Sequence, residues 1–150
     1  MIALDTNILV YAASAKNEID RHIAILDLFD RLGMTGAIIA LPVIGELFNV
    51  RRKKNFAKLD ILLTEVEIWT AAFSCAPPQM EDYLHASRLS ERFDLQYFDA
   101  LIIAISTRAG ATLLLSEDMQ DGLAVDGLRI VNPFEARNEG LLANYFASVF

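Results

Sequence analysis

The chain opens with the stretch MIALDTNILVYA, residues 1–12, in which an apolar run is interrupted by one carboxylate, one hydroxyl and one amide. Residues 2–4 are apolar without polar alternation, which is typical of a short strand covered on both faces in a parallel sheet. Asp5 would then lie at the carboxyl end of that strand, where open parallel sheets bind their ligands. Alternatively, Asp5 or Thr6 caps a helix predicted at residues 8–13. The stretch therefore predicts either a helix cap or the first ligand of a metal site.

The composition predicts one globular domain. The chain has 150 residues, of which 54% are hydrophobic and 22% charged, enough to build a core and unlike a disordered segment. No apolar run reaches the roughly 18 residues that a membrane span needs. Asp5 would interrupt any signal segment, so we expect a cytoplasmic protein without membrane contact. The single cysteine, Cys75, has no partner for a disulfide or a metal cluster, and we expect a buried thiol.

The net charge of −7 argues against indiscriminate binding to nucleic acid, which depends on protein cations replacing the counterions of phosphates. It does not exclude a nucleic-acid substrate, because bound metal ions can neutralise clustered carboxylates. Five of the 13 basic residues fall in one short segment: Arg51, Arg52, Lys53, Lys54 and Lys58. This segment could contact an RNA backbone, or it could be a solvated helix face.

Apolar periodicity divides the rest of the chain into alternating helices and strands. Buried strands are predicted at residues 2–4, 36–41, 111–115 and 128–131. Helices are predicted at residues 19–32, 43–54, 56–76, 79–93 and 97–108. The helix at residues 97–108 is apolar nearly all round, which indicates that it is buried. Strands that alternate with helices indicate an α/β fold with a parallel sheet.

Four acidic residues are expected at one edge of this sheet, because each crossover helix begins at the carboxyl ends of the parallel strands. Asp5 and Asp118 follow strands, Glu46 lies about one turn into a helix, and Asp99 lies in the first turn of another. Clusters of oxygen ligands suit Mg²⁺ or Mn²⁺. Asp121 could be a further ligand or only a turn residue.

Asp99 and Glu46 are flanked by apolar residues, where desolvation penalises an unpaired charge. Each acid has a local explanation as a helix-end or turn residue, and a distant cation such as Arg108 or Arg129 could pair with one of them. The coincidence of four acids on one edge nevertheless favours a metal site. Glu117 is expected to point to solvent.

Several segments together resemble PIN-domain ribonucleases: LDTNIL (residues 4–9), Glu46 in its helix, FDALI (residues 98–102) and SEDM (residues 116–119). Within that family, the size and order of these segments are similar to the VapC-type toxins of bacterial and archaeal toxin–antitoxin modules. The resemblance implies a three-layer α/β/α PIN domain at residues 1–134, with a central parallel sheet of four to five strands. Residues 135–150 would be a C-terminal extension that packs on the domain or on a dimer partner.

The resemblance also implies a Mg²⁺- or Mn²⁺-dependent endoribonuclease. The catalytic residues that hold the metal would be Asp5, Glu46, Asp99 and Asp118, with Asp121 as a candidate further ligand. Thr6 or Ser116 would orient a carboxylate or the scissile phosphate, and Asn7 would fix the turn. VapC-like toxins are typically homodimers silenced by a small antitoxin. The expected partners are therefore RNA, an antitoxin protein and a second copy of the chain.

Other classes of protein fit the sequence less well. A haloacid-dehalogenase-type phosphatase requires a second aspartate two residues after the first, and Asn7 stands there. No Gly-x-Gly-x-x-Gly pattern follows the first strand, so a dinucleotide site is unsupported. The remaining alternative is a PIN-fold module that binds a metal or a partner without nuclease turnover.

Overall fold

A six-stranded sheet in the order β3-β2-β1-β4-β6-β5 forms the centre of the computed structural model, which describes residues 1–16, 18–33, 36–53 and 58–148. The strands are β1 (Ile2–Leu4), β2 (Ala37–Ala40), β3 (Ser74–Ala76), β4 (Leu113–Leu115), β5 (Ala124–Val125) and β6 (Leu128–Val131). Neighbouring strands are parallel except for β5, which pairs antiparallel with β6.

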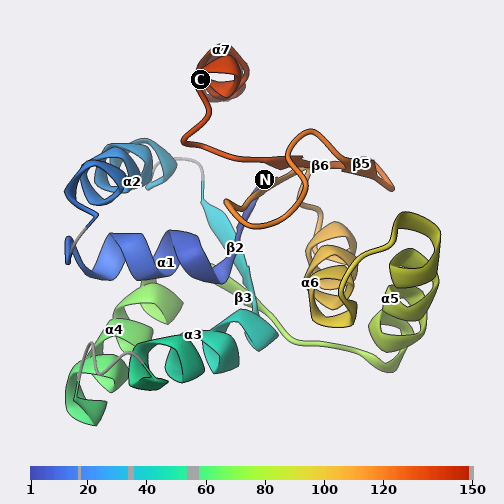
Figure 1. The fold of residues 1–150 in the computed structure, drawn as a ribbon, viewed down its shortest axis with the longest axis horizontal. Helices are drawn as coiled ribbons and strands as arrows, with labels where there is room; N and C mark the ends of the chain where they lie inside the picture. The colour runs from blue at the N-terminus through green and yellow to red at the C-terminus, as the bar shows by residue number, and fades with distance from the viewer. Residues whose placement is uncertain (17, 34–35, 54–57, 149–150) are drawn as a thin grey trace.

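Helices cover both faces of this sheet, with α1 and α2 on one side and α5 and α6 on the other (Figure 1). The helices are α1 (Thr6–Ala13), α2 (Ile19–Leu32), α3 (Leu41–Lys53), α4 (Leu59–Ala72), α5 (Met80–Phe93), α6 (Tyr97–Arg108) and α7 (Glu139–Ser148). The predicted three-layer architecture is confirmed, although the sheet has six strands where four to five are expected. Among the described residues, the helices are too short or too polar to cross a membrane.

The core is built around β1, which lies between β2 and β4. All three residues of β1 are fully buried, as the absence of polar alternation predicts. Helix α6 is buried along residues 100–106, which confirms that its nearly uniform apolar surface belongs to the interior. The carboxyl end of β1 is therefore fixed between two neighbouring strands.

The structure differs from the predicted helix at residues 56–76, of which the first two residues lie outside the described chain. Helix α4 ends at Ala72, and the next residues become β3, which pairs with β2. A residue that precedes proline is disfavoured in the helical conformation, so Pro77 and Pro78 favour an extended segment before them. Cys75 lies half-buried in this strand instead of fully buried, and burial raises the pKa of its thiol.

The prediction contains β6 but lacks β5, with which it forms a short hairpin. Its turn consists of Asp126 and Gly127, which both have positive φ, at 50° and 86°. An Asp-Gly pair with two positive φ angles is typical of a two-residue hairpin turn. With only two residues, β5 is too short for the alternation of polar and apolar side chains to reveal it.

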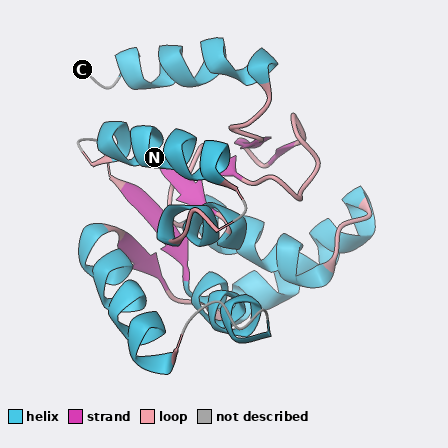
Figure 2. Cartoon of the chain, turned by 60° about the vertical axis from the view of Figure 1, so that its left-hand side comes forward, coloured by secondary structure: helices cyan, strands magenta, loops and turns pink. Residues whose placement is uncertain are grey.

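Helix α7 lies alongside α2 (Figure 2). Its side chains Leu142 and Phe146 are buried, with 7% and 4% of their surface exposed. The guanidinium carbon of Arg31 in α2 lies 4.5 Å from the centre of the Phe146 ring. The described part of the extension at residues 135–150 thus contacts the body of its own chain.

Replacing Phe146 by alanine should destabilise the protein, because the ring fills a buried site between α7 and the rest of the domain. We expect the free energy of unfolding to fall by about 3 kcal/mol, the lower end for a buried Phe→Ala change. Urea unfolding followed by circular dichroism measures the change. Asn144→Ala, at an exposed position of the same helix, is the matched control. If the two variants had the same free energy of unfolding, the prediction that Phe146 packs α7 against the domain would be contradicted.

Candidate functional site

Asp5 lies at the carboxyl end of β1 and is buried, with 6% of its surface exposed. Its Oδ1 accepts a 2.7 Å hydrogen bond from the backbone N–H of Thr6 and thereby caps α1. Its Oδ2 accepts a 2.7 Å hydrogen bond from the hydroxyl of Ser116, directly after β4. Asp5 is therefore a helix cap, as one of the two predicted alternatives has it, and it is also fixed at the sheet edge by the neighbouring strand.

Thr6 and Asn7 connect two further acids to the same turn. The Thr6 hydroxyl donates a 2.6 Å hydrogen bond to Oε2 of Glu46 in α3. The Asn7 amide donates a hydrogen bond to Oδ2 of Asp118 in the loop after β4. The turn after β1 thus places carboxylates from three parts of the chain at one edge of the sheet.

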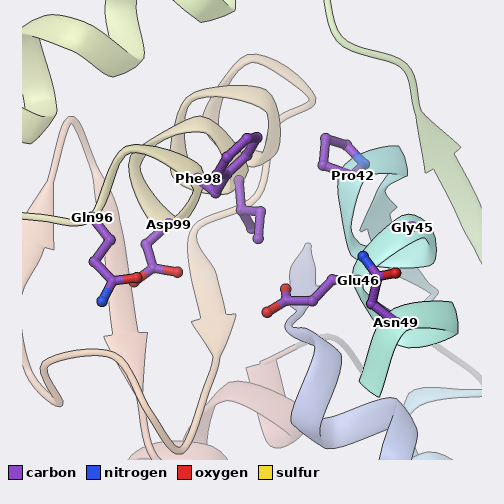
Figure 3. Close-up of a pocket in the computed structure, with 8 residues that line it drawn as sticks. Pro42, Gly45, Glu46, Asn49, Gln96, Phe98 and Asp99 are labelled. Atoms are coloured by element: carbon purple, nitrogen blue, oxygen red, sulfur yellow. The ribbon is translucent and has the colours of Figure 1, made fainter. Parts of the chain in front are cut away.

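Asp99 approaches the same edge from α6, in whose first turn it lies half-buried. Figure 3 shows the carboxylates of Asp99 and Glu46 pointing toward one another from opposite sides of a pocket. The pocket has a volume of about 420 Å³. It is lined by Pro42, Gly45, Glu46, Asn49, Gln96, Phe98, Asp99 and Ile102.

Burial and mutual repulsion perturb these acids. Burial is the main cause that raises the pKa of Asp5 from 3.8 to about 6; the hydrogen bonds from Ser116 and Thr6 act against it, and repulsion from Glu46 and Asp99 adds to it. The pKa of Asp99 is raised by burial first and then by repulsion from Glu46 and Asp118. Because each carboxylate makes ionisation of another less favourable, the four acids form one electrostatic group.

No counter-charge accompanies this group among the described residues, whose ion pairs all use other carboxylates. Arg108, considered above as a partner for these acids, binds Asp82 instead, at 2.8 Å. A group of oxygen donors without a counter-charge has the chemistry that Mg²⁺ or Mn²⁺ requires. The described His, Cys, Asp and Glu side chains do not form a closed cluster of three around one point. The donors therefore fit a hydrated ion held by one or two carboxylates, as Mg²⁺ often is, better than a cage made only of protein.

Asp121 is engaged away from this group. Its Oδ1 accepts hydrogen bonds from the backbone N–H of Asn132 at 2.8 Å and from the Asn138 amide at 2.9 Å. Its Oδ2 forms a 2.6 Å ion pair with Arg137. Burial opposes ionisation of Asp121, but these three partners together lower its pKa. The structure favours the turn-residue interpretation of Asp121.

Glu117 is not directed to solvent, so that expectation is wrong. It accepts a hydrogen bond from the Tyr11 hydroxyl and forms a 2.5 Å ion pair with Arg21. Only 17% of its side-chain surface is exposed. The Arg21 guanidinium also lies over the rings of Tyr11 and Phe134. This contact ties the loop that carries Asp118 to α1 and α2.

The basic segment after Glu46 needs a correction at one position. Arg51 is 2% exposed and forms a 2.6 Å ion pair with Glu65 of α4, so its guanidinium cannot reach an RNA backbone. Arg52 and Lys53 are exposed in the last turn of α3. Lys54 lies outside the described residues.

Besides Glu46 and Asp99, the pocket lining includes two amide side chains and one aromatic ring to which the sequence analysis assigns no role in the site. Asn49 lies three residues after Glu46 and therefore on the same helix face, a spacing that could have identified it. Gln96 precedes the first turn of α6, and Phe98 lies directly before Asp99. Their position at the pocket depends on how α3 faces α6, which the sequence pattern does not specify.

Comparison with known proteins identifies the family. The chain belongs to the PIN domain family, whose model matches residues 2–121. No curated protein matches it by sequence. The resemblance to PIN domains derived from the sequence is therefore confirmed.

Solved structures with a similar fold include toxins and their complexes. One is VapC20 of Mycobacterium tuberculosis, a sarcin–ricin loop cleaving toxin (TM-score 0.63, 16% identity, 79% of this chain and 90% of that chain). Another is VapBC2 from Rickettsia felis bound to a DNA fragment from its promoter (TM-score 0.64, 17% identity, 87% and 97%). A third is a toxin–antitoxin complex from Klebsiella pneumoniae (TM-score 0.58, 17% identity, 90% and 99%). At these identities the similarity shows a shared fold.

Asp5→Asn should stabilise the protein at neutral pH when divalent ions are removed. Because the pKa of Asp5 is about 6 in the folded state and 3.8 without its surroundings, wild-type stability should fall as the pH rises from about 4 to about 6. Asparagine avoids this loss and can still accept the capping hydrogen bond. We expect the variant to gain up to about 3 kcal/mol in free energy of unfolding at pH 7.

Urea unfolding in EDTA at neutral and acidic pH measures this gain. The gain should shrink as the pH falls and vanish below the unperturbed pKa of 3.8, because Asp5 is then protonated in both states. A variant that is less stable than wild type at pH 7, or a gain independent of pH, would contradict the prediction.

Proposed function

We propose that this protein is a Mg²⁺- or Mn²⁺-dependent endoribonuclease that hydrolyses RNA phosphodiester bonds as the toxin of a toxin–antitoxin module. The observation that carries the proposal is the group of four carboxylates held at one sheet edge without a counter-charge from the described cations. Membership of the PIN domain family and the fold shared with VapC20, a sarcin–ricin loop cleaving toxin, support the same activity.

In this proposal the metal site is formed by four carboxylates, one or two of which would contact the hydrated ion directly: Asp5, Glu46, Asp99 and Asp118. A bound divalent ion lowers the pKa of a coordinated water and neutralises charge on the phosphate oxygens. Hydrogen bonds from three neighbouring side chains would keep the carboxylates in place for that ion. Ser116 holds the second oxygen of Asp5, Thr6 holds Glu46, and Asn7 holds Asp118.

Arg52 and Lys53 are the described candidates for contact with the RNA backbone. Both are exposed at the end of α3, the helix that also carries Glu46. Cations in such a position attract phosphates without reading sequence. They would supply positive charge for the RNA on a chain whose net charge is −7. The contact of Lys54 with the RNA backbone stays a prediction.

The proposal includes an antitoxin protein as partner, supported by the toxin–antitoxin complexes among the structures of similar fold. It also includes a homodimer, a cytoplasmic location, and a division of the chain into a catalytic domain at residues 1–134 and an extension at residues 135–150. A module that binds only a protein partner is disfavoured by the unpaired acids, whose mutual repulsion destabilises the fold. A module that binds a metal without turnover would keep the same acids, and the cleavage assay below distinguishes it from a nuclease.

Asp5→Asn and Asp99→Asn should each abolish RNA cleavage. Removing a residue that only orients metal ligands typically lowers activity about 10- to 100-fold. Loss of a ligand itself should lower the cleavage rate by more than that. Cleavage of labelled structured RNA in Mg²⁺ or Mn²⁺ measures the rate. Asp30→Asn, an exposed aspartate in α2, is the control and should cleave as the wild type does. Induced expression should arrest growth with the wild type and not with Asp5→Asn.

Wild-type activity without added metal, or cleavage by Asp99→Asn at the wild-type rate, would overturn the nuclease proposal. Calorimetric titration with Mn²⁺ tests the metal site independently of RNA. Binding by the wild type and no cleavage of any RNA would favour the binding module.

Thr6→Val should weaken metal binding while leaving all four carboxylates in the chain. Valine has nearly the shape of threonine but cannot donate the 2.6 Å hydrogen bond that holds Glu46. We expect Mn²⁺ affinity to fall by about 10- to 100-fold, as for other residues that orient metal ligands. Thr6→Ser keeps the hydroxyl and should restore most of the affinity. Equal affinity of the Val and Ser variants would remove Thr6 from this role.

A further inference from the structure

Phe98 stands at the mouth of the site pocket with 69% of its surface exposed, although it is a large apolar residue. The Tyr97 ring packs edge-on against it, with 5.7 Å between the ring centres, and limits its orientation. Figure 3 shows the Phe98 ring at the rim, opposite Pro42 of α3 and above the two carboxylates. A face of an aromatic ring is therefore presented at the entrance of the acidic site, where it can stack on a flat ligand.

Two amide side chains flank the same pocket. Asn49 lies beside Glu46 on α3, and Gln96 lies beside Asp99 at the start of α6 (Figure 3). Each amide carries both donors and an acceptor, as recognition of a base edge requires. The volume of about 420 Å³ is within the range of about 300–1,000 Å³ that small ligands occupy.

We infer that this pocket binds one unpaired nucleobase of the RNA substrate, stacked on Phe98 and read at its edge by Asn49 and Gln96. The inference rests on the proposed function and adds a specificity site to it. The apolar part of the lining, formed by Pro42, Phe98 and Ile102, suits the flat face of a base better than a phosphate. A base within a duplex is already paired and stacked, so the pocket selects single-stranded or loop RNA.

The test uses RNA that reports stacking. Oligoribonucleotides of mixed sequence with one 2-aminopurine, whose fluorescence is quenched by stacking, are titrated with the full chain in Mg²⁺. The Asp5→Asn background suppresses cleavage and leaves the pocket lining intact, since Asp5 does not line it. We compare Phe98 with Phe98→Trp and Phe98→Leu in this background. Met80→Ala, at a residue that is also 69% exposed, is the matched control.

Quenching at one position of the RNA is expected with Phe98 and with Phe98→Trp. Phe98→Leu should lose that quenching and bind the RNA about tenfold more weakly, within the range for loss of one base–aromatic stack. Met80→Ala should behave as its parent does. Asn49→Ala and Gln96→Ala should keep the quenching but change which base is preferred at that position.

The inference would be overturned if Phe98→Leu gave the same quenching and the same RNA affinity as its parent. It would also be overturned if the protein quenched 2-aminopurine equally within a duplex of the same sequence. A cationic side chain of a protein partner could also occupy an acidic pocket with an aromatic rim. If Phe98→Leu weakened binding of an arginine-rich peptide and left RNA binding unchanged, the pocket would belong to that partner and the inference would fail.

Failure of this inference can be distinguished from failure of the proposed function. If the wild-type chain cleaves no RNA, the nuclease proposal fails. If it cleaves RNA, and Phe98→Leu in the otherwise wild-type chain has the same kcat/KM and the same base preference at the cleavage site, only the base pocket fails.

Discussion

The buried carboxylate of Asp5 is the interaction on which the rest of the site depends. One of its oxygens binds the first amide of α1 and the other binds the hydroxyl that follows β4, so it joins a helix to two central strands. With the turn fixed in this way, Thr6 and Asn7 can hold acids from α3 and from the loop after β4. The carboxylates are gathered by their neighbours, because their own charges repel one another.

The acids of the site differ from the other buried acids in the protein. Asp82 has a two-pronged contact with Arg108, which lowers its pKa, and Glu65 is paired with Arg51. Each of these pairs joins two helices and compensates its own charge. Asp5 and Asp99 have raised pKa values and no paired cation among the described residues. An arrangement that opposes folding in this way is typical of a functional site.

The sequence was sufficient for local features and insufficient for contacts between distant segments. Short apolar stretches identified β1, β2 and β4, a stretch interrupted only by Arg129 identified β6, and parallel topology then placed the four acids at one edge. The burial of Arg51 could not be predicted, because Arg51 to Lys54 form a continuous basic run and the partner Glu65 lies in the next helix. Glu117 was misjudged for the same reason, since Tyr11 and Arg21 are about a hundred residues away in the chain. The strand β3 was missed because its three residues follow a strong helical pattern.

The sheet ends in very short strands on both sides, with three residues in β3 and two in β5. An edge of this length offers few unpaired backbone groups, and Pro77 directly after β3 removes one more donor. Such short edges disfavour edge-to-edge association with other sheets. The same feature bears on recognition: a partner finds little strand to extend, which favours docking on the surfaces of the helices.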